Sequence, residues 1–178
     1  MLTWLKKRRD RRETARSFYG SIVTRARERI FYAEWGVPDT LQGRFEMILL
    51  HMVLALRRLA AEGHAGGRLA RALNEAFVVD MDDIMREMTF GDLAVPREVK
   101  RATAALYDRH AAYLAGLASP HDMVLPQAIQ AQLAYLDHGG RLDPLRMAAY
   151  MRSAATALDA QPSVEVLAGQ PAWPQPVG

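Results

Sequence analysis

The sequence predicts an all-α fold, a single-domain helical bundle of about six helices with a basic N-terminal helix and a proline-rich C-terminal tail. Apolar residues recur three and four positions apart along most of the chain, which is the spacing of one helix face. No segment alternates between apolar and polar residues for long enough to indicate a strand. The chain has 178 residues, of which 50% are hydrophobic, and this is enough for one domain with a buried core.

The first predicted helix covers roughly residues 3–31 and has an unusual charge. Phe18, Ile22 and Ala26 belong to its apolar stripe. Residues 1–30 contain ten Lys and Arg against three Asp and Glu, a net charge of +7, whereas the whole chain carries only +3. The asymmetry indicates two surfaces with different partners, and anionic lipid, RNA and plain solvent all remain open for the basic one. The residues that we predict for lipid or RNA contact are Trp4, Lys6, Lys7, Arg8, Arg9, Arg11 and Arg12.

The second and third predicted helices follow a break at residues 36–40, Gly-Val-Pro-Asp-Thr. Asp39 or Thr40 is expected to cap the second helix, because side chains of this kind accept hydrogen bonds from the free backbone amides of a helix start. The glycines within residues 63–67 are expected to end this helix, and the third helix covers about residues 69–88. The apolar stripes are Leu41, Phe45, Ile48, Met52, Leu56 and Leu59 in the second helix, and Leu73, Phe77, Met81, Ile84 and Met88 in the third.

A fourth helix is predicted to open at Val95-Pro96, because proline fits the first turn of a helix. Two shorter helices are expected near residues 125–136 and 145–158. The side chains of the fourth helix that we expect to pack against the core are Val99, Leu106, Tyr107, Tyr113 and Leu114.

The two ends of the chain differ in composition from its middle. Four prolines after residue 161 indicate a flexible tail, because proline interrupts both helices and sheets. The predicted organisation is a basic N-terminal segment at residues 1–14, a helical domain at 15–160 and a flexible proline-rich tail at 161–178.

Several protein classes are excluded by what the sequence lacks. It has no cysteine, which excludes disulfides, thiolate metal sites and cysteine nucleophiles. The longest apolar run, residues 47–56, is much shorter than the ~20 residues needed to cross a bilayer. The N-terminus also lacks the apolar core of a signal peptide. We therefore expect a bacterial cytoplasmic protein, peripheral at the inner face of the cytoplasmic membrane, with a mitochondrial location as the alternative.

The densest polar cluster is the run of residues 80–87, Asp-Met-Asp-Asp-Ile-Met-Arg-Glu. Aspartate-rich helices can hold magnesium for diphosphate chemistry, so a magnesium-dependent enzyme of the helical isoprenoid type is one alternative. Such chemistry needs carboxylates from at least two places, and no second acidic motif is present. Asp82 and Arg86 have the spacing of a helix ion pair, whereas Asp83 and Glu87 would repel each other mildly. A solvated charged face and a partner-binding face both remain open.

No arrangement of residues in the sequence indicates catalysis. The five histidines are scattered, and His51, inside an apolar helix, is interpreted as a hydrogen-bonded packing residue. No serine lies in a nucleophile elbow, and no glycine-rich loop resembles a phosphate cradle. Met81, Met85 and Met88 belong either to the core or to a surface that grips apolar segments. We therefore expect no catalytic residue, no metal, no cofactor and no small-molecule substrate.

Two blocks of the sequence resemble the ubiquinol–cytochrome c chaperone family. The first consists of Phe31-Tyr32 followed by residues 35–51, Trp-Gly-Val-Pro-Asp-Thr-Leu-Gln-Gly-Arg-Phe-Glu-Met-Ile-Leu-Leu-His. The second, residues 80–100, is similar to the central signature of the family, and the similarity continues through residues 107–113. The resemblance covers roughly residues 15–155, and neither block is a short pattern that is easily met by chance.

The resemblance implies an assembly chaperone that acts by binding and has no catalytic residues. Family members assist newly made cytochrome b during biogenesis of the ubiquinol–cytochrome c reductase complex, and in mitochondria they act beside the ribosome with a small partner protein. A basic terminus would supply proximity to a ribosome or to an anionic membrane. The alternative is a helical scaffold or membrane-surface adaptor with another client protein. The partner surface that we predict is a helix–turn–helix corner formed by Asp80, Asp82, Asp83, Arg86, Glu87, Gly91, Asp92, Val95, Pro96 and Lys100.

Overall fold

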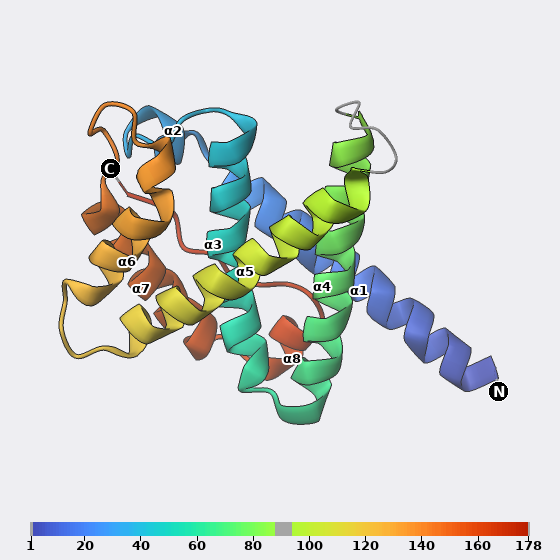
Figure 1. Ribbon diagram of the computed structural model, residues 1–178. Helices are drawn as coiled ribbons and strands as arrows, with labels where there is room; N and C mark the ends of the chain where they lie inside the picture. Colours follow the sequence, from blue (N-terminus) through green and yellow to red (C-terminus); the bar gives the residue numbers. More distant parts are fainter. Residues whose placement is uncertain (1, 88–93, 178) are drawn as a thin grey trace.

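The protein is built from helices that pack around one central helix (Figure 1). A computed structural model describes the backbone of residues 2–87 and 94–177, and the side chains of residues 5–86 and 94–177. Within these ranges every regular element is a helix, which confirms the all-α prediction. The elements are α1 (Leu2–Ala26), α2 (Arg29–Ala33), α3 (Leu41–Ala60), α4 (Gly63–Glu87), α5 (Val95–Ala118), α6 (Val124–Leu133), the 3-10 helix η1 (Ala134–Leu136), α7 (Pro144–Ala160) and α8 (Ser163–Leu167).

The central helix is α3, which packs against α1, α4, α5 and α7. Every residue from Glu46 to Ala55 is buried, as expected for a helix that is apolar on almost all sides. The longest apolar run of the sequence is therefore the centre of the core. None of the described helices is both long enough and apolar enough to span a membrane. Thr40 is the cap of α3, because its hydroxyl accepts a 3.1 Å hydrogen bond from the amide of Gly43.

Only the C-terminal half of α1 belongs to the core, where Phe18 and Ile22 are fully buried. The N-terminal half projects away from the body, toward the lower right of Figure 1. The single first helix that the sequence predicts up to residue 31 is divided, because α1 ends at Ala26 and α2 begins at Arg29. The hydroxyl of Tyr32 donates a 2.6 Å hydrogen bond to the Ala26 carbonyl, which α1 leaves without a helical partner.

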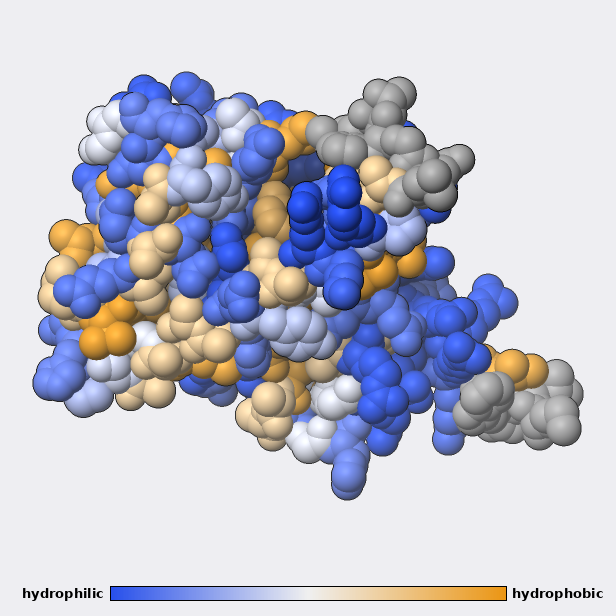
Figure 2. Space-filling model, viewed as in Figure 1, coloured by the Kyte–Doolittle hydropathy of each residue, from blue (hydrophilic) through white to orange (hydrophobic). Residues whose placement is uncertain are grey.

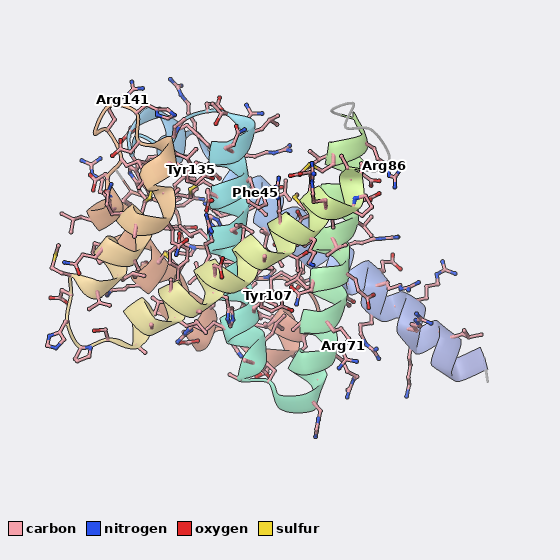
Figure 3. All side chains as sticks on the ribbon, viewed as in Figure 1. Phe45, Arg71, Arg86, Tyr107, Tyr135 and Arg141 are labelled. Atoms are coloured by element: carbon pink, nitrogen blue, oxygen red, sulfur yellow. The ribbon has the colours of Figure 1, made fainter. Side chains whose placement is uncertain are left out.

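Of the glycines that were expected to end α3, only Gly63 lies at the turn, whereas Gly66 and Gly67 lie inside α4. Gly63 has a φ of 57°, a left-handed conformation that turns the chain at little cost for glycine. The sequence predicted a start at about Leu69, but α4 begins at Gly63. α5 begins at Val95 with proline in its first turn, as predicted. Tyr107 was expected to pack against the core, but its side chain is 67% exposed and lies on the outer side of α5 (Figure 3).

The C-terminal segment returns to the body and packs against it. α8 lies within the predicted flexible tail, and the indole of Trp173 stands edge-on to the ring of His51 with 5.2 Å between centroids. The Trp173 Nε1–H donates to the hydroxyl of Ser21 at 3.3 Å, and Arg25 donates to the Trp173 carbonyl at 3.3 Å. The segment thus has a short helix and specific contacts with α1 and α3. The division of the chain into three segments stays a prediction.

A buried ion pair fixes α5 and η1 to the central helix. Glu46 of α3 is only 2% exposed. Its carboxylate accepts two hydrogen bonds from the guanidinium of Arg109, at 2.6 and 3.1 Å. A third hydrogen bond, 2.8 Å long, comes from the hydroxyl of Tyr135. A buried carboxylate with three donors is well satisfied, so this cluster holds the two halves of the chain together.

The second polar group in the centre of the core is His51, whose side chain is fully buried. Its Nδ1 lies 2.7 Å from the Met47 carbonyl, and its Nε2 lies 2.9 Å from the hydroxyl of Tyr150 in α7. These contacts confirm His51 as a hydrogen-bonded packing residue. Burial lowers the pKa of His51 to about 4, so the ring is neutral at physiological pH.

Candidate functional site

A groove of about 550 Å³ lies between α1 and α4, where α1 passes behind α4 in Figure 1. We call it the α1–α4 groove. The two helices pack against each other along this stretch, so each helix supplies one wall. Its lining residues are Arg12, Arg16, Tyr19, Gly20 and Val23 from α1, and Ala72, Glu75, Ala76, Val79, Asp80 and Asp83 from α4.

The two walls of the groove carry opposite charges. The α1 wall presents the guanidinium groups of Arg12 and Arg16, and the α4 wall presents the carboxylates of Glu75, Asp80 and Asp83. Within the described part of the chain, neither Arg12 nor Arg16 has an ion-pair partner, and the same holds for Glu75 and Asp83. Charged groups of both signs are therefore available to a ligand that lies between the helices.

The apolar part of the lining, which we call the floor of the groove, is made of small side chains. Gly20 of α1 faces open space, since a Cβ atom placed there would meet no atom within 4 Å. Ala72 and Ala76 line the opposite helix, and Val79 is 57% exposed. An exposed valine beside short side chains offers apolar surface to a ligand between the two charged walls.

One hydrogen bond joins the two walls at the deep side of the groove. The hydroxyl of Tyr19 donates to a carboxylate oxygen of Asp80 at 2.7 Å. Tyr19 is only 7% exposed, and its ring packs edge-on against Phe77. Burial, together with the hydrogen bond to Asp80, raises the pKa of the Tyr19 phenol, so the hydroxyl stays protonated and remains a donor.

The structure divides the predicted partner surface of α4 between two sides of the helix. Asp80 and Asp83 line the groove. Asp82 forms a 2.6 Å ion pair with Arg86, as its spacing predicted, and neither residue lines the groove. Arg86 lies near the upper end of α4 in Figure 3.

The remaining predicted partner residues lie at and before the start of α5. Val95 is fully buried, which removes it from the exposed surface and makes it a packing residue that anchors α5. Pro96 and Lys100 are exposed, and strongly hydrophilic side chains gather over this part of α5 in Figure 2. Gly91, Asp92 and the side chain of Glu87 lie outside the described residues, as does Met88.

The predicted lipid or RNA contacts lie on the part of α1 that projects from the body, where hydrophilic side chains dominate the surface (Figure 2). All of the basic residues among them are exposed except Arg11, which is half-buried, and the side chain of Trp4 is not described. Arg12 also lines the α1–α4 groove. The basic segment and the acidic helix, which the sequence suggested as separate surfaces, therefore meet at one place.

Of the lining residues that the sequence did not single out, three carry a charged group or a hydroxyl, namely Arg16, Tyr19 and Glu75. A signal existed for the α4 wall, since positions 72, 75, 76, 79, 80 and 83 follow the three-and-four spacing of one helix face. That face combines small and acidic residues, which is unusual for a core stripe. For the α1 wall, Arg12 and Arg16 are four apart and so share one side of the helix.

The chemistry of the groove suits binding more than metal-dependent catalysis. Magnesium-assisted diphosphate chemistry needs carboxylates converging from two places on the same ion. Here the acidic wall faces arginines, and no group of three or more metal-ligating side chains with suitable geometry occurs in the described part of the chain. Opposed charges on either side of an apolar floor can instead give complementary contacts to a polypeptide that carries charges of its own.

Comparison with known proteins identifies the family of the chain. A family profile described as "Ubiquinol-cytochrome C chaperone" matches residues 33–173. Curated proteins gave no match. Among solved structures, the chain is similar to the crystal structure of the Cbp3 homolog from Brucella abortus, with 31% sequence identity and a TM-score of 0.80, over 98% of this chain and 97% of that chain. The sequence match and the shared fold together show that this chain belongs to the ubiquinol–cytochrome c chaperone family.

Proposed function

We propose that this protein, as an assembly chaperone of the ubiquinol–cytochrome c reductase complex, binds newly made cytochrome b and acts without catalysis. Family membership supports the chaperone role and implies a client protein. The observation that carries the proposal for the site is the α1–α4 groove, with charged walls on either side of an apolar floor. We place the client in this groove.

The groove fits the end of a membrane-protein helix. Such a helix is apolar along its length, and its cytoplasmic end is flanked by lysine and arginine. The apolar floor around Val79 would cover the last apolar turn. The carboxylates of Glu75 and Asp83, which have no ion-pair partner among the described residues, would receive the basic flank. A client held in this way would keep its apolar surface away from solvent until the next assembly step.

The basic part of α1 would hold the chaperone where its client emerges. Its exposed lysines and arginines attract anionic lipid headgroups or RNA phosphates, and each such residue adds roughly 1 kcal/mol near an anionic membrane. We therefore place the protein at the inner face of the cytoplasmic membrane, beside the membrane or the ribosome. A small partner protein would take a surface outside the groove, and the exposed start of α5 is available for it.

The experiment that tests this function is deletion of the gene, followed by difference spectroscopy of membrane cytochrome b. We expect loss of cytochrome b and of reductase activity, with other respiratory complexes intact and full rescue by the restored gene. Rescue with the E75K/D83K variant should fail although the protein is present, because both substitutions reverse the acidic wall. The D108K/D122K variant makes the same charge change at exposed positions outside the groove and should rescue normally.

The two parts of the proposal fail separately in this experiment. Normal cytochrome b after deletion would contradict the role in cytochrome b biogenesis and leave a scaffold or adaptor with another client. Loss of cytochrome b after deletion, followed by full rescue with E75K/D83K, would retain the function and remove the client from the groove.

A further inference from the structure

A second pocket lies where the end of α1, α2 and the start of α3 meet. It has a volume of about 310 Å³ and shares no lining residue with the α1–α4 groove. Three of its five lining residues are arginines, and only one is acidic, so the pocket has a formal charge of +2. The lining residues are Arg27, Arg29, Tyr32, Asp39 and Arg44.

The carboxylates near this pocket are already committed to other groups. Asp39, the acidic residue of the lining, accepts a 2.7 Å hydrogen bond from the guanidinium of Arg44. Glu28 lies between Arg27 and Arg29 in sequence, but its carboxylate lies 3.5 Å from Arg25 instead. Within the described part of the chain, Arg27 and Arg29 have no carboxylate partner. The positive charge of the pocket is therefore not neutralised by the protein.

Tyr32 supplies the wall between these arginines. Its hydroxyl proton is used in the hydrogen bond to the Ala26 carbonyl, so the phenol has no proton left for a ligand. Burial raises the pKa of this phenol to about 12, although the nearby charges of Arg44 and Arg27 act in the opposite direction. The phenol is neutral at physiological pH and does not repel an anion. Recognition of a ligand would then depend on the guanidinium groups.

We infer that this pocket binds a phosphate group, either free phosphate or the phosphate of a lipid headgroup. A guanidinium can form two parallel hydrogen bonds to a phosphate, and Arg27 and Arg29 both line the pocket from the turn between α1 and α2. A volume of about 310 Å³ accommodates a phosphate with a small substituent. The inference is independent of the proposed function, because it uses neither the groove nor the projecting part of α1.

The test compares two double variants that remove the same charge from the full-length protein. R27A/R29A removes the two arginines of the pocket that have no carboxylate partner among the residues that the structure describes. R68A/R71A removes two exposed arginines of α4 outside it, and Arg71 is labelled in Figure 3. Binding of inorganic phosphate is measured by calorimetry, and binding to phosphatidylcholine vesicles with and without phosphatidic acid by flotation. R27K/R29K keeps the charge and loses the planar guanidinium groups, so it serves as a second variant with the least disturbance of folding.

We expect R27A/R29A to weaken binding by roughly tenfold or more, R27K/R29K to weaken it less, and R68A/R71A to leave it unchanged. This pattern with inorganic phosphate supports a site for free phosphate. The same pattern with phosphatidic acid vesicles alone supports a lipid headgroup. Absence of binding to both probes, or equal weakening in R27A/R29A and R68A/R71A, would overturn the inference.

Discussion

Tyr19 of α1 donates a 2.7 Å hydrogen bond to Asp80 of α4, and this bond closes the deep side of the α1–α4 groove. It also fixes the direction of one carboxylate in the acidic wall. In the described part of the chain Glu75 and Asp83 have no such partner, so Asp80 is tied to α1 while the other two carboxylates of the wall are not.

The Y19F substitution tests the structural role of that bond. Phenylalanine keeps the edge-on contact with Phe77 and removes only the hydroxyl, so we expect a loss of about 1 kcal/mol in the free energy of unfolding. Urea denaturation measures the loss. The control is Y107F, since Tyr107 is 67% exposed and should tolerate the change. Equal stability of Y19F and the parent protein would show that water replaces the bond without cost.

The R109A substitution tests the ion pair in the core. It leaves the carboxylate of Glu46, which is 2% exposed, without its two strongest donors. We expect a loss of about 3 kcal/mol in the free energy of unfolding, because an uncompensated buried charge is costly. The exposed Arg101 of α5 also pairs with a glutamate, and R101A should have a much smaller effect. A double variant E46L/R109L should recover part of the loss, and its failure to do so would contradict the explanation by buried charge.

The burial of His51 predicts that the protein loses stability in mildly acidic solution. The pKa of His51 falls from an ordinary 6.5 to about 4 in the folded protein. Between pH 6.5 and about 4, the His51 ring therefore binds a proton in the unfolded chain and does not bind one in the folded chain. Stability therefore decreases as the pH falls from 6.5 to about 4, by about 3 kcal/mol in total, and this contribution is constant above pH 6.5. The measurement is the free energy of unfolding against pH.

The matched variants for this prediction are H51Q and H64Q. H51Q lowers stability at neutral pH because it disturbs the hydrogen bonds to Met47 and Tyr150. The slope of unfolding free energy against pH reports how many more protons the unfolded chain binds than the folded one, and H51Q should lower this number by about one. H64Q, at an exposed position, should leave the slope unchanged. An unchanged slope in H51Q would mean that other groups cause the acid sensitivity.

The W173A substitution tests whether the C-terminal segment stabilises the body. The indole covers His51 and donates to Ser21, so its removal should cost about 1–2 kcal/mol of unfolding free energy. V177A, at a residue that is 77% exposed, serves as the control and should have no measurable effect. If W173A were as stable as V177A, the segment would behave in solution as the flexible tail that its prolines predict.

Local signals in the sequence predicted much of the fold. Thr40 and Pro96 mark helix starts through chemistry that acts within a few residues, and both helices begin where these residues indicate. The apolar residues around Met47 are also a local signal, because their spacing of three and four positions predicted an apolar helix there. The division between α1 and α2 was missed because residues 27 and 28 are arginine and glutamate, which carry no signal for a helix end.

The groove could be predicted only in part, because it depends on which helices meet in space. The acidic residues Asp80 and Asp83 stood out by their density, but nothing local to them indicates that Arg12 and Arg16 lie opposite. Trp173 illustrates the same limit, since its contact with His51 joins residues that are far apart in the sequence. Composition alone favours a flexible tail, and it carries no information about the contacts that the indole of Trp173 makes with α1 and α3.

The most direct test of the proposed function is site-specific photo-crosslinking in cells that are making cytochrome b. The photo-reactive residue benzoyl-phenylalanine replaces Val79, which is 57% exposed on the floor of the groove, or Tyr107, which is 67% exposed on the outer side of α5. We predict a crosslink to newly made cytochrome b from position 79 and none from position 107. A crosslink to cytochrome b from position 107 alone, or a crosslink from position 79 only to another protein, would contradict the placement of this client in the groove.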